Sequence, residues 1–173
     1  MANNILRFKG HNIGKSIQED NCDKIIEEIF YLSKKTKCEI LYPEDVTVSN
    51  DLNGKPTIKE IKDVYEDDMI LDIGPKSIKK ISDIIEKSNT ILWNGPAGYF
   101  ENPDFAKGSL EILKKIVEKN KTNTIFSVAG GGDTVALLNS MGAINNFNFV
   151  STAGGAFLEY LEGKELPGIK ALN

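Results

Sequence analysis

Two glycine turns, each placed directly after a short apolar run, constrain this chain more than any other feature. Glycines at 130–132 follow the apolar run 124–129, and glycines at 154 and 155 follow the apolar segment 147–150. Each turn leads into a segment with helical spacing, so we predict strand, glycine turn and helix twice in succession. A turn without side chains lets a phosphate approach the backbone, and a helix start offers free N–H donors. The turns therefore predict a site for a polyphosphate, such as that of a nucleotide.

The rest of the chain alternates short apolar runs with amphipathic segments. We predict strands at 39–42, 69–73 and 90–93, and helices at 16–35, 77–85 and 104–119. The first helix would start at a capping box formed by Ser16 and Glu19, and the second would be capped by Ser77. Asn53 and Gly54 lie between two further strands, 46–48 and 57–61, and predict a tight hairpin. The expected fold is α/β: a partial doubly wound parallel sheet flanked by helices, Rossmann-like, with a small antiparallel hairpin.

Ligands of doubly wound sheets bind outside the carboxyl ends of the strands. We expect four glycine-bearing strand ends to lie along that edge: 72–75, 94–96, 130–133 and 152–155. Four such ends are more specific than one glycine motif. The sequence has neither a P-loop nor the Gly-x-Gly-x-x-Gly of dinucleotide-binding folds, so those motifs do not explain the glycines.

Charge and composition narrow the class of protein. The chain has 173 residues and a formal net charge of -4, without a block of Lys or Arg. Binding to nucleic acid or to an anionic membrane is therefore disfavoured. No apolar run reaches transmembrane length, and Cys22 and Cys38 are expected to be reduced, so we expect a cytoplasmic protein.

Three polar side chains near the predicted edge have two interpretations each. Asp133 either holds Mg²⁺ bound to a nucleotide or caps the helix that follows it. Thr134 either donates its hydroxyl to a phosphate or caps the same helix. Glu101 either binds ribose hydroxyls or is simply solvated. Trp93 is expected in the core rather than against a base.

The motifs together resemble phosphoglycerate kinase, and most closely its bacterial form. The resemblance is carried by residues 93–101 (Trp-Asn-Gly-Pro-Ala-Gly-Tyr-Phe-Glu), 130–134 (Gly-Gly-Gly-Asp-Thr) and 151–159 (Ser-Thr-Ala-Gly-Gly-Ala-Phe-Leu-Glu). Residues 12–16 and 69–76 match as well, so the resemblance covers essentially the whole chain.

The resemblance implies a glycolytic enzyme that transfers a phosphoryl group between 1,3-bisphosphoglycerate and ADP, with Mg²⁺ accompanying ATP or ADP. It implies two lobes, of which residues 1–173 would be an incomplete C-terminal, nucleotide-binding domain, truncated at its N-terminus. The substrate domain would be absent and the chain inactive alone. A separately encoded N-terminal lobe would then be a partner besides ATP or ADP. The alternative is a non-catalytic nucleotide-binding or interaction module derived from the kinase.

The resemblance also implies roles for individual residues. Glu101 would bind the ribose, and Leu71 and Asn94 would line the nucleotide pocket. The phosphates and magnesium would be held by Gly131, Gly132, Asp133 and Thr134, with Asp133 reaching the metal through the Mg-nucleotide. Gly154 and Gly155 would meet the transferring phosphoryl group. Two positions depart from the usual pattern: Ala153 keeps the backbone donors, and Tyr99 is expected to narrow the nucleotide rim.

Overall fold

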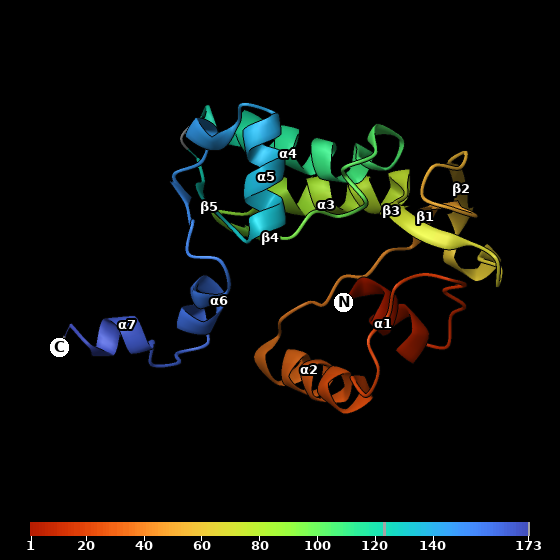
Figure 1. Ribbon diagram of the computed structural model, residues 1–173, viewed down its shortest axis with the longest axis horizontal. Coiled ribbons are helices and arrows are strands. Elements are labelled where there is room, and N and C mark those ends of the chain that lie inside the picture. The colour runs from red at the N-terminus through yellow and green to blue at the C-terminus, as the bar shows by residue number, and fades with distance from the viewer. Residues whose placement is uncertain (123, 173) are drawn as a thin grey trace. The chain divides into compact units, whose positions relative to one another are not determined.

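The strands form two separate three-stranded sheets in the computed structural model, which describes residues 1–122 and 124–172 (Figure 1). The chain divides into two units. The first contains residues 1–81 and 97–110, and the second contains residues 82–96 and the described residues from 111 onward. Each unit is described by itself below.

The sheet of the first unit is antiparallel. Its central strand β1 (Asp45–Ser49) pairs with β2 (Thr57–Glu60) and β3 (Met69–Ile73). The predicted hairpin is confirmed as β1 and β2, but the reason given for its turn is wrong. Neither Asn53 nor Gly54 has a positive φ. A Cβ added at Gly54 would lie 2.2 Å from the hydroxyl of Ser49, so close approach explains this glycine.

Strand β3 has the predicted bounds, but it runs antiparallel to β1 and does not belong to the parallel sheet. The prediction that residues 72–75 share one edge with the other three glycine-bearing ends is therefore wrong. A Cβ added at Gly74 would lie 2.3 Å from the carboxyl carbon of Asp45. The close approach of this carboxylate, not of a phosphate, explains the glycine after β3.

Two buried aspartates of this sheet cap helices that lie elsewhere in the sequence. At α3 (Pro75–Lys87), the carboxylate of Asp45 accepts from the N–H groups of Lys76 and Ser77 at 2.9 and 2.8 Å. Ser77 therefore lies inside the helix and does not cap it as predicted. At α4 (Lys107–Asn120), which follows the short helix η2 (Pro103–Phe105), Asp72 accepts from the N–H of Gly108 at 2.7 Å. Burial raises the pKa of Asp72 to about 6.

The N-terminal segment differs most from the prediction. It contains α1 (Ala2–Phe8), which was not expected, and α2 (Asp23–Thr36), which begins seven residues after the predicted start at Ser16. The hydroxyl of Ser16 donates to the C=O of Ile13 and accepts from the N–H of Ile70 at 2.8 Å, so the capping box is wrong. The predicted strand 39–42 is not formed.

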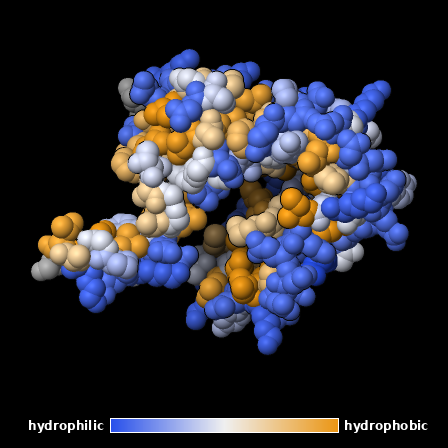
Figure 2. Space-filling view, in the orientation of Figure 1, coloured by the Kyte–Doolittle hydropathy of each residue, from blue (hydrophilic) through white to orange (hydrophobic). Residues whose placement is uncertain are grey.

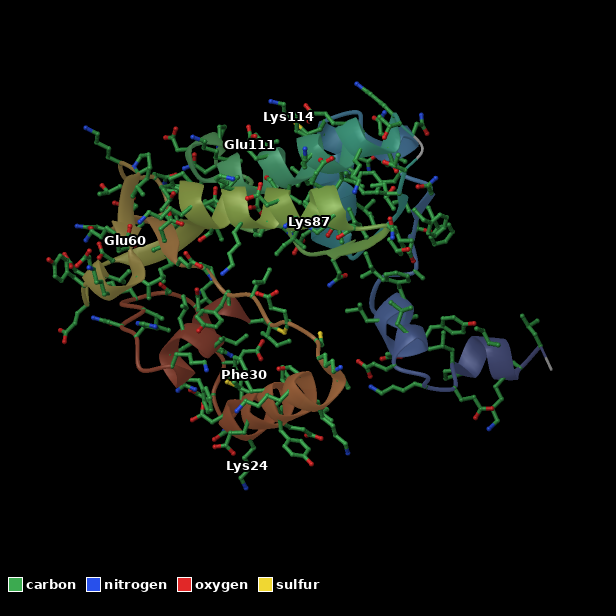
Figure 3. The ribbon with its side chains drawn as sticks, turned by 180° about the vertical axis from the view of Figure 1, so that it is seen from behind. Lys24, Phe30, Glu60, Lys87, Glu111 and Lys114 are labelled. Atoms are coloured by element: carbon green, nitrogen blue, oxygen red, sulfur yellow. The ribbon has the colours of Figure 1, made fainter. Side chains whose placement is uncertain are left out.

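Side chains from α1, α2 and the strands pack the first unit. Phe30 of α2, labelled in Figure 3, stacks on Phe8 with ring centroids 6.4 Å apart, and the Lys9 ammonium lies 4.1 Å from the Phe30 ring centroid. The first unit also has a core of buried apolar side chains, one of which, Ile61, belongs to the short helix η1 (Ile61–Asp63): Leu6, Ile13, Val46, Val48, Ile61 and Val64.

The second unit contains the predicted parallel sheet. Its strands are β4 (Thr90–Asn94), β5 (Phe126–Gly130) and β6 (Phe149–Val150), in that order. Helix α5 (Gly132–Ser140) and η3 (Ile144–Asn146) connect β5 to β6, and α6 (Gly155–Leu161) and α7 (Pro167–Lys170) follow. The α/β class, with a partial parallel sheet, flanking helices and a separate hairpin, is confirmed.

One face of the parallel sheet is packed. It contains Trp93, Ser127 and Ala129, all buried, so the prediction for Trp93 is confirmed. Asn120 near the end of α4 donates to the Ser127 hydroxyl at 2.5 Å, which places the end of this helix on the packed face. In addition, the Lys119 ammonium donates to the C=O of Ser88, beyond the end of α3, at 2.7 Å.

Several apolar side chains of the second unit are exposed. Figure 2 shows hydrophobic residues along the C-terminal segment, where the exposed side chains are Leu158, Leu161, Ile169 and Leu172. Within the described residues, no helix combines the length and the apolar character that crossing a membrane requires.

Candidate functional site

Three glycine-bearing strand ends of the second unit lie along one edge of the parallel sheet. Asn94 at the end of β4 stands opposite Gly130 at the end of β5. Beyond β6, the N–H of Ser151 donates to the C=O of Ala129 in β5 at 2.8 Å. The predicted segments 94–96, 130–133 and 152–155 therefore share the carboxyl edge. In parallel sheets this edge is where ligands bind.

The turn between β5 and α5 favours glycine at position 131. This residue is the N-cap of α5 and has a φ of 87°. A Cβ there would lie 2.6 Å from the Asn94 side-chain oxygen. Asn94 therefore lies against the glycine turn, as expected if both belong to one site.

Thr134 has a role that the sequence did not indicate. Its side chain is fully buried in the first turn of α5, and its hydroxyl accepts from the N–H of Gly95 at 2.7 Å. The C=O of Gly95 in turn accepts from the indole N–H of Trp93 at 2.9 Å. Thr134 thus ties the loop after β4 to the start of α5, which is neither of the two roles considered for it.

Asp133 is exposed at the second position of α5. The N-cap of α5 is Gly131, and Asp133 lies inside the helix. The alternative of Asp133 as the helix cap is therefore wrong. The described residues contain no group of three His, Cys, Asp or Glu side chains that would hold a metal ion. A magnesium ion at Asp133 would therefore take its other ligands from phosphate oxygens and water, which is how Mg²⁺ commonly binds in nucleotide sites. A single exposed carboxylate beside a helix start fits this role.

The local fold explains some of the edge glycines and leaves others unexplained. A Cβ at Gly130 would lie 2.4 Å from the ring of Phe157, and Gly154 has a φ of 57°, so both positions require glycine. Gly132 and Gly155 have no positive φ, and a Cβ at either would meet no atom within 4 Å. Nothing in the described chain requires glycine at these two helix starts.

Leu71 and Glu101 belong to the first unit and are described separately. Leu71 is buried, and its C=O accepts from the N–H of Tyr99 at 2.7 Å. The same loop carries Glu101, which is exposed. Asn102, which sequence reasoning missed, fixes the loop by donating to the C=O of Leu52 at 2.9 Å. The structure thus brings the backbone of Leu71 to the loop of Glu101.

Parallel strands that end in glycine turns and helix starts define an open α/β sheet, an architecture whose ligands bind at the strand ends. A family model described as "Phosphoglycerate kinase" matches residues 1–164. The chain belongs to the phosphoglycerate kinase family.

Individual relatives agree with this assignment. The chain is 46% identical over 174 residues to a phosphoglycerate kinase of Zymomonas mobilis, and the match covers 99% of this chain and 44% of the relative. A phosphoglycerate kinase of Caulobacter vibrioides is 43% identical, with the same coverage of each chain. The solved structure of phosphoglycerate kinase from Coxiella burnetii aligns with a TM-score of 0.91 and 36% identity, covering 99% of this chain and 44% of that one. The chain therefore spans less than half the length of the relatives it matches.

Proposed function

We propose that this chain is the nucleotide-binding part of a phosphoglycerate kinase and binds Mg-ADP or Mg-ATP at the carboxyl edge of β4, β5 and β6. The observation that carries the proposal is the pair Gly132 and Gly155. Each lies at a helix start with open space in place of a side chain and without a backbone conformation that demands glycine. A phosphate held against the backbone N–H groups accounts for both.

The proposed roles follow from the position of each residue. Gly131 is the N-cap of α5, and Gly132 and Thr134 lie in its first turn, so their N–H groups are free to donate to phosphate oxygens. Bound magnesium would neutralise charge on the phosphates, and Asp133 would hold it. Gly154 and Gly155, at the turn into α6, would meet the phosphoryl group in transfer. Thr134 adds a positioning role through its bond to Gly95.

The remaining roles rest on the family alone. Glu101 is proposed to bind the ribose hydroxyls, and Leu71 and Asn94 to line the nucleotide pocket. Glu101 is exposed and lies on a fixed loop, so its carboxylate is accessible to a ligand.

We expect no phosphoglycerate kinase turnover from this chain alone. Phosphoryl transfer depends on positioning and on stabilisation of the transferred charge, and the relatives have more than half of their length outside the match. An N-terminal lobe is the partner that would complete the reaction. A non-catalytic nucleotide-binding module would bind the nucleotide but gain no activity when that lobe is added.

The test is a titration with Mg-ADP followed by NMR, comparing Gly132→Ala and Gly155→Ala with the wild type. We expect a dissociation constant of roughly 1 mM for the wild type, or about 4 kcal/mol of binding free energy. Both variants should weaken binding without loss of stability, because alanine at an unstrained position stabilises by about 0.4–1 kcal/mol. Gly168→Ala in α7 is the matched control, since its Cβ also meets open space. Unchanged binding in Gly132→Ala and Gly155→Ala would refute the proposal.

A further inference from the structure

Ser109 is a fully buried polar residue of the first unit. It lies in the first turn of α4, and its hydroxyl accepts from the N–H of Ala97 at 2.9 Å. Ala97 lies at the start of the loop that carries Glu101. A backbone N–H that loses its acceptor away from water costs free energy, so such a bond holds the backbone in place. Ser109 therefore fixes the start of the Glu101 loop.

The middle of the same loop is held against the end of β3. The N–H of Tyr99 donates to the C=O of Leu71 at 2.7 Å. At Gly98 the chain passes so close to β3 that an added Cβ would lie 2.6 Å from the C=O oxygen of Leu71 and 2.6 Å from a carboxylate oxygen of Asp72. The loop therefore has no room to move towards β3.

Asp72 fixes Ser109 beside β3. Its carboxylate accepts from the N–H of Gly108 at 2.7 Å, and a Cβ added at Gly108 would lie 2.3 Å from a carboxylate oxygen of Asp72. Gly108 immediately precedes Ser109, so the first turn of α4 is held at the end of β3. The bond between Ser109 and Ala97 consequently opposes movement of the loop away from β3. The end of β3, the start of α4 and the loop form one closed set of contacts within the first unit.

Glu101 lies in a turn that follows these contacts. The N–H of Asn102 donates to the C=O of Tyr99 at 3.2 Å and closes the turn, and the side chain of Asn102 donates to the C=O of Leu52 at 2.9 Å. Because the Glu101 side chain is exposed, the position of its carboxylate depends on how the backbone on either side is held. A displacement of about 1 Å at a binding group is enough to lose most of its effect.

We propose that Ser109 is a positioning residue for nucleotide binding: through Ala97 it holds the loop where the Glu101 carboxylate meets the ribose hydroxyls. The inference rests on the proposed function, from which it takes the role of Glu101. Loss of the Ser109 hydroxyl then weakens binding of a nucleotide that has ribose hydroxyls. Binding of a nucleotide without them changes little, since the proposed phosphate contacts come from the backbone of the second unit.

The experiment compares Mg-ADP with Mg-2′,3′-dideoxy-ADP in NMR titrations of the full chain. The wild type should bind Mg-ADP about tenfold more tightly, as expected for hydrogen bonds to a charged group, and Ser109→Ala should reduce this preference to about twofold or less. Glu101→Ala should abolish it. Ser77→Ala is the matched control. Ser77 is buried in the same unit and its hydroxyl accepts from the N–H of Glu44 at 3.0 Å, so this variant should lose stability and keep the preference.

Two results with the variants would overturn the inference. One is a Ser109→Ala variant that keeps the wild-type preference for Mg-ADP while Glu101→Ala loses it, which leaves the proposed role of Glu101 intact. The other is a Ser77→Ala variant that loses the preference, because the preference would then follow stability alone. A wild type that binds both nucleotides equally refutes the ribose role of Glu101 and this inference together.

A measurement on the wild type tests the inference even if Ser109→Ala does not fold. At equal occupancy, Mg-ADP should slow hydrogen exchange of the Ala97 amide more than Mg-2′,3′-dideoxy-ADP does. The reason is that binding through Glu101 favours the state in which Ala97 donates to Ser109. Equal slowing by the two nucleotides would show that the ribose and the Ser109 bond are not coupled, and would overturn the inference.

Discussion

Replacing Thr134 with valine tests how the candidate site is built. Valine has nearly the same shape but puts a methyl group where the Thr134 hydroxyl accepts from the N–H of Gly95 at 2.7 Å. Gly95 is only half-buried, so water compensates part of the loss, and we expect a destabilisation of about 1–3 kcal/mol. For a protein of this size that corresponds to a Tm lower by roughly 2–12 °C. The loop after β4 should also lose its fixed position beside the start of α5.

The assay combines thermal unfolding with hydrogen exchange of the Gly95 amide. In Thr134→Val this amide should exchange faster, because its acceptor is gone, and Mg-ADP binding should weaken with it. Thr134→Ser is the control: it keeps the hydroxyl but removes a buried methyl group, so it loses some stability while the Gly95 amide stays protected. If Thr134→Val leaves both the exchange of Gly95 and the stability at wild-type values, the tie between β4 and α5 has been misjudged.

Three further predictions concern the metal, the pH dependence and the exposed surface. Asp133→Ala should remove the magnesium dependence of ADP binding in NMR titrations and leave the circular dichroism unchanged; equal binding with and without magnesium in both proteins contradicts the proposed role. The pKa of Asp72 is raised from 3.8 to about 6 in the folded protein. Its contribution to the free energy of unfolding is therefore complete below about pH 4 and decreases between pH 4 and 6. At pH 7 the free energy of unfolding is lower than below pH 4 by up to about 3 kcal/mol. Chemical unfolding over this pH range should show that fall in the wild type, and Asp72→Asn should flatten it; parallel curves would exclude Asp72 as the cause. A dye that fluoresces on apolar surfaces should bind the chain, less so after Phe149→Asp, because the Phe149 side chain is 54% exposed on β6; a sharp melt at high temperature without dye binding would argue against this.

The strands were largely predictable from the sequence because their signals are local. The strand 69–73 was predicted with its observed bounds, and β4 and β5 within two residues at each end, since each is an apolar run stopped by glycine or asparagine. The direction of β3 was not predictable, because an apolar run of five residues does not show which strand it pairs with. The start of α2 was misplaced because Ser16 forms its hydrogen bond with Ile70, 54 residues away, and not with its own helix.

The candidate site shows the same division between local and distant signals. The glycine turns after β5 and β6 were visible in the sequence, because each follows an apolar run and precedes a helix. The bond between Thr134 and Gly95 joins residues 39 apart and leaves no local pattern. Similarly, Gly74 resembled a ligand-binding glycine, and only the tertiary position of the Asp45 carboxylate shows why a side chain is excluded there.

The two ends of α3 gain their hydrogen-bond partners at different times during synthesis of the chain. The N-terminal cap, Asp45, leaves the ribosome before the helix does, but the Lys119 ammonium that binds the carbonyls at its other end lies 34 residues after Ile85. At about 5–20 residues per second, those carbonyls wait roughly 2–7 s for their donor. A nascent chain at that stage carries a helix secured at one end only. The last turn of α3 should therefore stay frayed, and open to chaperones or proteases, until the end of α4 emerges.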